Sequence, residues 1–133
     1  MFGKRDERKP LAKIDTLIGA GAFIEGNIRF SGGLRIDGTV KGNVEAADGA
    51  TASTLILSEQ ARIEGSVAVS YLVTNGTVVG QVSVAECLEM QPRAKIVGDV
   101  EYSLIEMHQG AVVEGRLVHG VSKSGELKLA VSN

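Results

Sequence analysis

Hydrophobic and polar residues alternate over short stretches along most of the chain, and one pattern of seven positions recurs. It reads small residue, any residue, aliphatic, any residue, glycine, any residue, aliphatic, and the copies that begin at Thr39 and Thr77 are one residue shorter. Alternation with a period of two predicts β-strands, and no stretch shows the 3.6-residue period of an amphipathic helix. The six copies span Ala22–Ile28, Thr39–Val44, Ala61–Val67, Thr77–Val82, Ala94–Val100 and Ala111–Leu117.

The glycines of these copies are separated by 16, 23, 15, 18 and 17 residues. Such a period is too short for helical repeats or propeller blades. We therefore predict an all-β fold, a parallel β-solenoid in which each coil contains a few short strands and the inward aliphatic side chains stack in ladders. The one long gap contains Asp48–Ser53, which we interpret as a loop at one corner. The coil glycines are Gly26, Gly42, Gly65, Gly80, Gly98 and Gly115.

A second alternating pair of apolar residues lies between successive copies. In the segment that contains Tyr71 the inward pair is either Tyr71 and Val73 or Leu72 and Thr74, and the sequence does not decide between them. In the other segments the pairs are Leu34 and Ile36, Leu55 and Leu57, Leu88 and Met90, and Ile105 and Met107.

Composition supports a core of small aliphatic side chains, because 44% of the residues are hydrophobic but only 4% are aromatic. Cys87 is the single cysteine, which excludes an intrachain disulfide and suits a reducing compartment. No apolar run approaches the roughly 20 residues of a membrane-spanning helix. The charged start is followed by Pro10 rather than by the apolar region of a signal peptide, so we expect a cytoplasmic protein.

Neither end of the predicted solenoid shows the amphipathic helix that often caps repeat proteins. Residues 14–21 lead directly into the first coil, and residues 126–131 alternate like one more strand. Two uncapped ends predict end-to-end stacking by strand addition, which needs no nucleotide. We expect this polymerisation interface to contain Leu17, Ile18, Phe23, Val113 and Leu117.

The ordered set of repeats resembles the bactofilin family of bacterial cytoskeletal proteins. The resemblance covers roughly residues 14–120 and is carried by Ile18-Gly19, Phe23–Ile28, Leu34–Gly38, Val40–Val44, Ala61–Gly65, Ala94–Val100 and Gly110–Gly115. It implies a single-stranded, right-handed parallel β-helix of about six windings with short disordered tails. It also implies nucleotide-independent filaments on the inner face of the membrane that act in cell shape or cell-wall synthesis. Val113 stands where we expect an aromatic residue in many members.

The first 13 residues carry a net charge of +3 and the remainder a net charge of −5. The start of the chain also resembles the membrane-targeting motif of many bactofilins. Phe2 can enter the headgroup boundary, and each basic residue near anionic lipid contributes about 1 kcal/mol. The acidic body argues against nucleic-acid binding. We divide the chain into a basic tail (1–13), a β-helix domain (14–120) and a C-terminal strand or tail (121–133), with membrane binding by Phe2, Lys4, Arg5, Arg8 and Lys9.

Motifs for catalysis or cofactor binding are missing from the sequence. No GxxxxGK[ST] phosphate loop occurs, and His108, His119 and Cys87 are too sparse to predict a metal site. We expect no enzyme activity, cofactor or metal, and we expect the partners to be other copies of the chain, the inner membrane face and peptidoglycan-synthesising or -modifying enzymes. The alternatives are a hexapeptide-repeat acyltransferase, which requires near-constant coils of 18 residues, and an ice-binding solenoid, which requires an outward threonine column.

Overall fold

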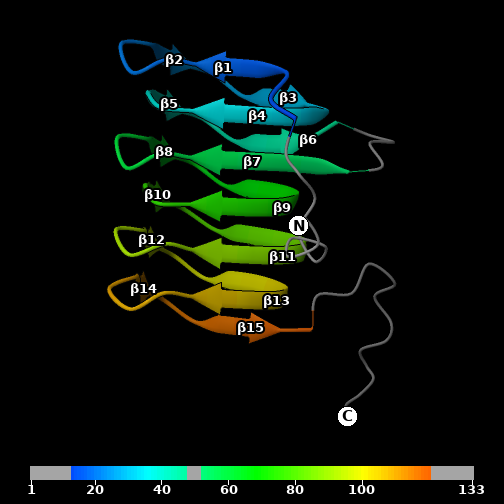
Figure 1. The fold of residues 1–133 in the computed structure, drawn as a ribbon, viewed down its shortest axis with the longest axis vertical. Helices are drawn as coiled ribbons and strands as arrows, with labels where there is room; N and C mark the ends of the chain where they lie inside the picture. The colour runs from blue at the N-terminus through cyan, green and yellow to red at the C-terminus, as the bar shows by residue number, and fades with distance from the viewer. Residues whose placement is uncertain (1–12, 48–51, 121–133) are drawn as a thin grey trace, which may run out of the picture.

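The computed structural model describes residues 13–47 and 52–120, and these residues form only strands and turns. Their fifteen strands wind into a rod whose coils stack one on another, from β1 at one end to β15 at the other (Figure 1). Every pair of neighbouring strands among them is parallel. The predicted all-β parallel solenoid of about six turns is confirmed.

Most strands are only three residues long, as expected for a chain that turns a corner after each side of a coil. The strands are β1 (Thr16–Ile18), β2 (Phe23–Glu25), β3 (Ile28–Phe30), β4 (Gly32–Ile36), β5 (Thr39–Lys41), β6 (Val44–Ala46), β7 (Ser53–Leu57), β8 (Arg62–Glu64), β9 (Val67–Thr74), β10 (Thr77–Val79), β11 (Val82–Met90), β12 (Lys95–Val97), β13 (Val100–Met107), β14 (Val112–Glu114) and β15 (Leu117–His119).

Each coil has three sides, which we call the first, second and third faces in chain order. The second face is a six-stranded sheet of β2, β5, β8, β10, β12 and β14. The first and third faces belong to one nine-stranded sheet, because β9, β11 and β13 continue around the corner from the third face into the first face of the next coil. The first face contains β1, β4, β7 and the second halves of β9, β11 and β13. The third face contains β3, β6, the first halves of β9, β11 and β13, and β15.

The core is built from columns of aliphatic residues in register on successive coils. The middle members of each column are almost completely buried; Ile96 and Val100, for example, are 0% exposed. On the first face Leu72 and Thr74 point inward, which settles the pair that the sequence left open. The Thr74 hydroxyl accepts a hydrogen bond from the Gly76 N–H at 3.1 Å, so its burial leaves no unsatisfied oxygen.

The corner between the first and second faces has two lengths. Four-residue corners such as Gln91–Ala94 close with a hydrogen bond from the last N–H to the first carbonyl oxygen, whereas the corner before β5 has only Asp37 and Gly38. Gly38 and Gly76 therefore occupy the small-residue position, and Thr39 and Thr77 lie in register with Arg62 on the neighbouring strand. The sequence alignment of Thr39 and Thr77 with the alanines was wrong. Counted from Gly38 and Gly76, both repeats have all seven residues, and it is the corner that is two residues shorter.

The remaining differences in coil length arise between the third and first faces. The chain extends from Ala46 at the end of β6 to Ser53 at the start of β7, which explains the long glycine spacing; residues 48–51 of the predicted loop lie outside the described residues. Ser53 was wrongly included in that loop, since it is a buried strand residue whose Oγ lies 3.3 Å from Ser70 Oγ. In β11 a register shift between Val84 and Cys87 accommodates an extra residue.

Candidate functional site at the ends of the solenoid

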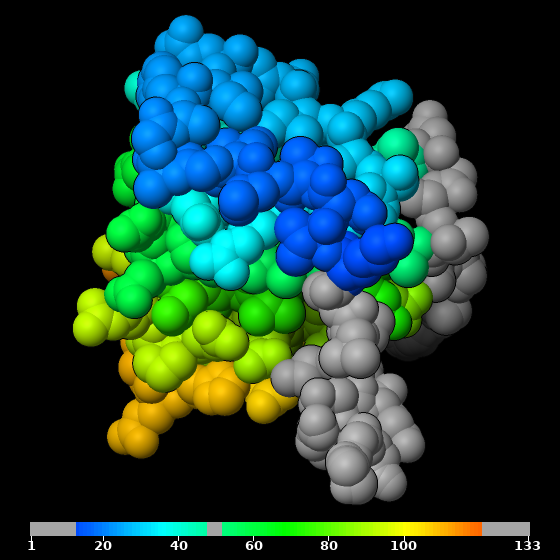
Figure 2. All heavy atoms as spheres, turned by 45° about the horizontal axis from the view of Figure 1, so that its top comes forward, coloured from blue at the N-terminus to red at the C-terminus, as the bar shows by residue number. Residues whose placement is uncertain are grey.

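Among residues 13–47 and 52–120, the strands of the two end coils are paired on one side only. At the N-terminal end, within the described ranges, β1 pairs only with β4, β2 with β5 and β3 with β6. At the C-terminal end, among the strands that the structure describes, β14 pairs only with β12, and β15 only with β13. Figure 2 brings the N-terminal end forward and shows the first coil in blue across it. Each end therefore presents strand edges whose N–H and C=O groups can bind another strand.

Apolar side chains accompany these edges at the N-terminal end. Ile18, Ile24 and Ile28 are the first members of the core columns, and each is only partly buried. Leu17 is 59% exposed and Phe23 is 56% exposed. The first coil therefore has an apolar end, since within the described part of the chain its core residues have a neighbouring coil on one side only, whereas their equivalents deeper in the rod have one on each side.

The C-terminal end also exposes apolar residues of the core columns. Val113 follows Ile96 in register on the second face and is only partly buried. Met107 follows Met90 on the first face; Met90 is 0% exposed, whereas Met107 is 41% exposed. Leu117, the last member of its column on the third face, is 45% exposed. These residues end the aliphatic core without a further coil over it among residues 13–47 and 52–120.

The predicted interface residues occupy two kinds of position. Ile18, Val113 and Leu117 lie at the ends of core columns, so a coil placed against either end would contact them. Leu17 and Phe23 instead lie on the outer sides of the first coil. Lys41 Nζ lies 5.5 Å from the centre of the Phe23 ring. Four further residues at the ends of core columns were not among the predicted interface residues, although their places in the first and last repeats could have identified them: Ile24, Ile28, Ile105 and Met107.

The coil glycines form a column at the corner between the second and third faces. A Cβ on Gly98 would lie 2.2 Å from the Gly80 carbonyl oxygen, and the φ angle of Gly98 is 149°. A residue with a side chain would therefore be strained and would also push the coils apart. The same close approach occurs at Gly42, Gly65, Gly80 and Gly115.

Next to this column, side-chain oxygens connect successive coils. Asn27 Oδ1 accepts a hydrogen bond from the Asn43 N–H, and Asn43 Oδ1 accepts one from the Ser66 N–H, both at 2.9 Å.

At the C-terminal end, Asp99 attaches the last coil. Asp99 Oδ1 accepts a hydrogen bond from the Arg116 N–H at 3.0 Å, and the Arg116 guanidinium lies 3.2 Å from Oδ2. The backbone hydrogen bond, and then the side-chain hydrogen bond, lower the pKa of Asp99. The sixth and last coil (the second half of β13, β14 and β15) is therefore fixed to the fifth coil (the second half of β11, β12 and the first half of β13) by a charged hydrogen bond as well as by its strands.

The predicted membrane-binding residues Phe2, Lys4, Arg5, Arg8 and Lys9 lie outside the described residues, as does the predicted C-terminal strand. Within residues 13–47 and 52–120 there is no helix with the length and apolar character needed to cross a membrane.

Comparisons with known proteins agree with this architecture. Residues 16–118 match the family model described as "Bactofilin: Polymer-forming cytoskeletal". The chain is 26% identical over 113 residues to bactofilin BacP of Myxococcus xanthus, covering 85% of this chain and 45% of BacP. It is 25% identical over 111 residues to bactofilin BacO of the same organism, covering 84% of each chain. The chain thus spans less than half the length of BacP but most of BacO. No solved structure matches it.

Proposed function

Because the chain belongs to the bactofilin family of polymer-forming cytoskeletal proteins, we propose that it stacks end to end, without nucleotide, into filaments. The observation that carries this proposal is the pair of open ends that residues 13–47 and 52–120 form, each with strand edges paired on one side and partly exposed core columns. A coil of a second subunit offers backbone groups and aliphatic residues of the same kind. The junction would therefore resemble the contact between two coils of one chain.

The energetics of such a junction favour a coil-on-coil contact over a contact through a few surface residues. Burying a large aliphatic side chain completely contributes roughly 1.5–3 kcal/mol. Association costs an estimated 4–15 kcal/mol in lost translational and rotational freedom. Ile18, Ile24 and Ile28 can contribute together at one end, with new strand hydrogen bonds added. Strand pairing and apolar burial supply this free energy without hydrolysis of a nucleotide.

We further propose that the filaments lie on the inner face of the cytoplasmic membrane through their N-terminal tails. The support is the sequence alone, in which Phe2 precedes Lys4, Arg5, Arg8 and Lys9. A single tail with a net charge of +3 would bind weakly, but a filament presents one tail for every subunit. Simultaneous binding of many tails would therefore give stable attachment.

The proposed role of the filament is a structural scaffold for cell shape or cell-wall synthesis, not catalysis. Peptidoglycan-synthesising or -modifying enzymes are the partners that such a scaffold would recruit. The experiment that tests the proposed function is sedimentation and electron microscopy of the purified full chain without nucleotide. Sedimenting filaments that are unaffected by ATP, GTP or EDTA are expected, and a monodisperse small species at tens of micromolar protein would overturn the proposal.

A further inference from the structure

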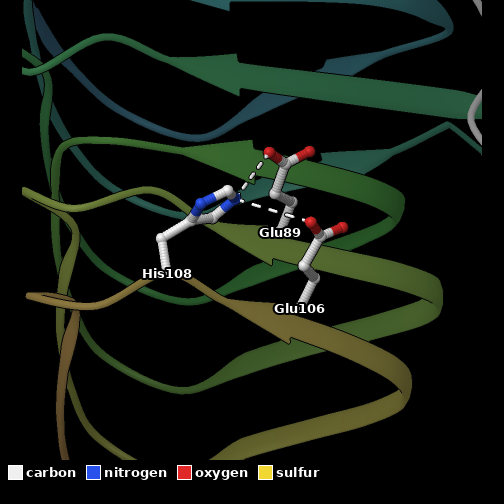
Figure 3. A group of neighbouring side chains, drawn as sticks. All are labelled: Glu89, Glu106 and His108. Carbon is white, nitrogen blue, oxygen red and sulfur yellow. Dashed lines mark hydrogen bonds and ion pairs between the residues drawn. The ribbon is translucent and has the colours of Figure 1, made fainter.

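A group of three ionisable side chains lies on the outer side of the first face, between the fifth and sixth coils (Figure 3). Glu89 on β11 and Glu106 on β13 are partners in register, so their side chains project from the same face of adjacent coils. His108 follows β13 directly and turns its ring toward both carboxylates. His108 Nε2 lies 3.1 Å from Glu89 Oε2 and 3.6 Å from Glu106 Oε2.

These distances suit ligands of one metal ion. Zn²⁺ binds imidazole nitrogen and carboxylate oxygen at about 2.0–2.2 Å, so two ligand atoms at neighbouring corners of a tetrahedron lie roughly 3.3–3.6 Å apart. The two nitrogen–oxygen distances bracket that range, and one nitrogen or oxygen from each of the three residues lies within 4.8 Å of the others. Small rotations of the glutamate side chains would bring all three atoms around one ion.

The burial of the three residues also suits a binding site. The Glu89 side chain is only 9% exposed, and it is held in a rigid strand, so its position is largely fixed before an ion arrives. His108 is 39% exposed and Glu106 is 47% exposed, which leaves a path from solvent to the three ligand atoms. Water can occupy the remaining coordination positions.

The kinds of ligand atom in the group suit a transition-metal ion. Glu89 and Glu106 offer carboxylate oxygens from adjacent strands, and His108 offers an imidazole nitrogen. Imidazole together with carboxylates suits Zn²⁺ and related transition metals, while Mg²⁺ and Ca²⁺ prefer oxygen ligands only.

We propose that Glu89, Glu106 and His108 form a binding site for a divalent transition-metal ion of the Zn²⁺ class, which clamps the sixth coil to the fifth. The site lies on the side of the rod and leaves the open C-terminal end free. It is therefore independent of the proposed end-to-end assembly.

The test uses the purified full chain, first treated with EDTA and then dialysed against micromolar ZnCl₂, with MgCl₂ in parallel. Elemental analysis is expected to find one Zn²⁺ per chain, and thermal unfolding followed by circular dichroism is expected to shift to a higher temperature with Zn²⁺ but not with Mg²⁺. Glu106→Gln and His108→Asn should weaken Zn²⁺ binding by at least about tenfold and remove the thermal shift.

Two variants serve as matched controls. His119→Asn removes the other histidine, whose ring lies 5.5 Å from that of Tyr102 and outside the group, and Cys87→Ser removes the thiol. Both should bind Zn²⁺ like the wild-type chain. Absence of bound Zn²⁺, or equal binding by His108→Asn and the wild type, would overturn the proposal. Filament sedimentation in EDTA is measured on the same samples, so failure of the metal site and failure of assembly are distinguishable.

Discussion

Val100 and Leu117 occupy the same position on adjacent coils, yet Val100 is 0% exposed and Leu117 is 45% exposed. Both are inward-facing aliphatic residues at the start of a third-face strand. Val100 lies between Val82 and Leu117, whereas Leu117 has a coil on one side only within the described ranges. The exposure of Leu117 is therefore a consequence of its place at the end of the column, and another coil would bury it.

Leu117→Arg is expected to separate folding from assembly. In the monomer the guanidinium can reach water from the end of the rod, so the coils beneath it should keep their structure. At a junction the charge would be buried without a partner, at a cost of several kcal/mol. We predict a strand-rich protein that stops at monomers, or at dimers joined through the other end, measured by circular dichroism and by light scattering after size exclusion.

Two substitutions control for this result. Ile96→Arg places the same charge between Val78 and Val113 in the middle of a column and should unfold the chain. Val118→Arg changes the neighbour of Leu117 on the outer side, and its filaments should persist. If Leu117→Arg forms wild-type filaments, the C-terminal coil is not a polymerisation surface. If Leu117→Arg unfolds like Ile96→Arg, residues 121–133 must cover that end.

Gly98→Ala should destabilise the rod much more than Gly26→Ala. Both glycines have positive φ angles, so both substitutions carry backbone strain of about 1–3 kcal/mol. Only at Gly98 would the new Cβ also meet a carbonyl oxygen, that of Gly80, whereas a Cβ on Gly26 meets nothing within 4 Å. Chemical denaturation followed by circular dichroism measures both. Equal losses for the two variants would show that the close contact between coils does not limit stability.

Asp99 should make the stability of the rod depend on acid pH. Its pKa is lowered from 3.8 in the folded chain by the hydrogen bonds from Arg116, so the stabilisation is present above that ordinary value and is lost as the pH falls through the lowered pKa. Asp99→Asn can keep the hydrogen bond from the Arg116 N–H but cannot titrate. We predict that the advantage in melting temperature of the wild type over Asp99→Asn shrinks below pH 3.8.

The titration of Glu64 does not disturb the comparison of the wild type with Asp99→Asn. The pKa of Glu64 is also lowered, chiefly by its hydrogen bond with Arg62, and this group titrates equally in the wild type and in Asp99→Asn. Its effect cancels in the difference. A difference in melting temperature that stays constant across the acid range would contradict a role for the Asp99 charge.

The periodic positions of the fold could be predicted from the sequence. Each repeat encodes one corner with its two flanking strands, so the equivalence of Ile96 with Val113 follows from counting back from Gly98 and Gly115. Corner lengths could not be predicted as well, because Gly38 and Thr39 are neighbouring small residues and either can be taken as the small residue that begins the repeat. Only the pairing of Thr39 with Phe23 shows that Gly38 occupies the corner position.

The side-chain arrangement of the candidate sites was less predictable. Alternation alone could have placed Leu17 on the outer side, because Ile18 continues the column that contains Ile36. The group around His108 could not be predicted from the spacing of histidine and cysteine, because its other two members are glutamates. Glu89 and Glu106 occupy the same position on adjacent coils. The coils differ in length, so the sequence does not reveal this equivalence, and only the pairing of β11 with β13 shows it.

Removal of residues 2–9 should release filaments from anionic liposomes without preventing assembly. The tail supplies the basic residues and Phe2, whereas the proposed junction uses only residues of the end coils. Phe2→Arg is the matched point variant, since it keeps the length and raises the charge while it removes the apolar side chain. Co-sedimentation with liposomes measures binding, and sedimentation without liposomes measures assembly. Equal liposome binding by the full-length and truncated chains would contradict a membrane role for this segment.

Negative-stain electron microscopy of the purified wild-type chain in buffer without nucleotide tests the central claim most directly. The open ends predict long, thin, unbranched filaments one rod in width, which form equally with or without ATP, GTP and EDTA. Uniform particles of one or a few rods at tens of micromolar protein, or filaments that appear only after nucleotide is added, would contradict assembly through the ends of the solenoid.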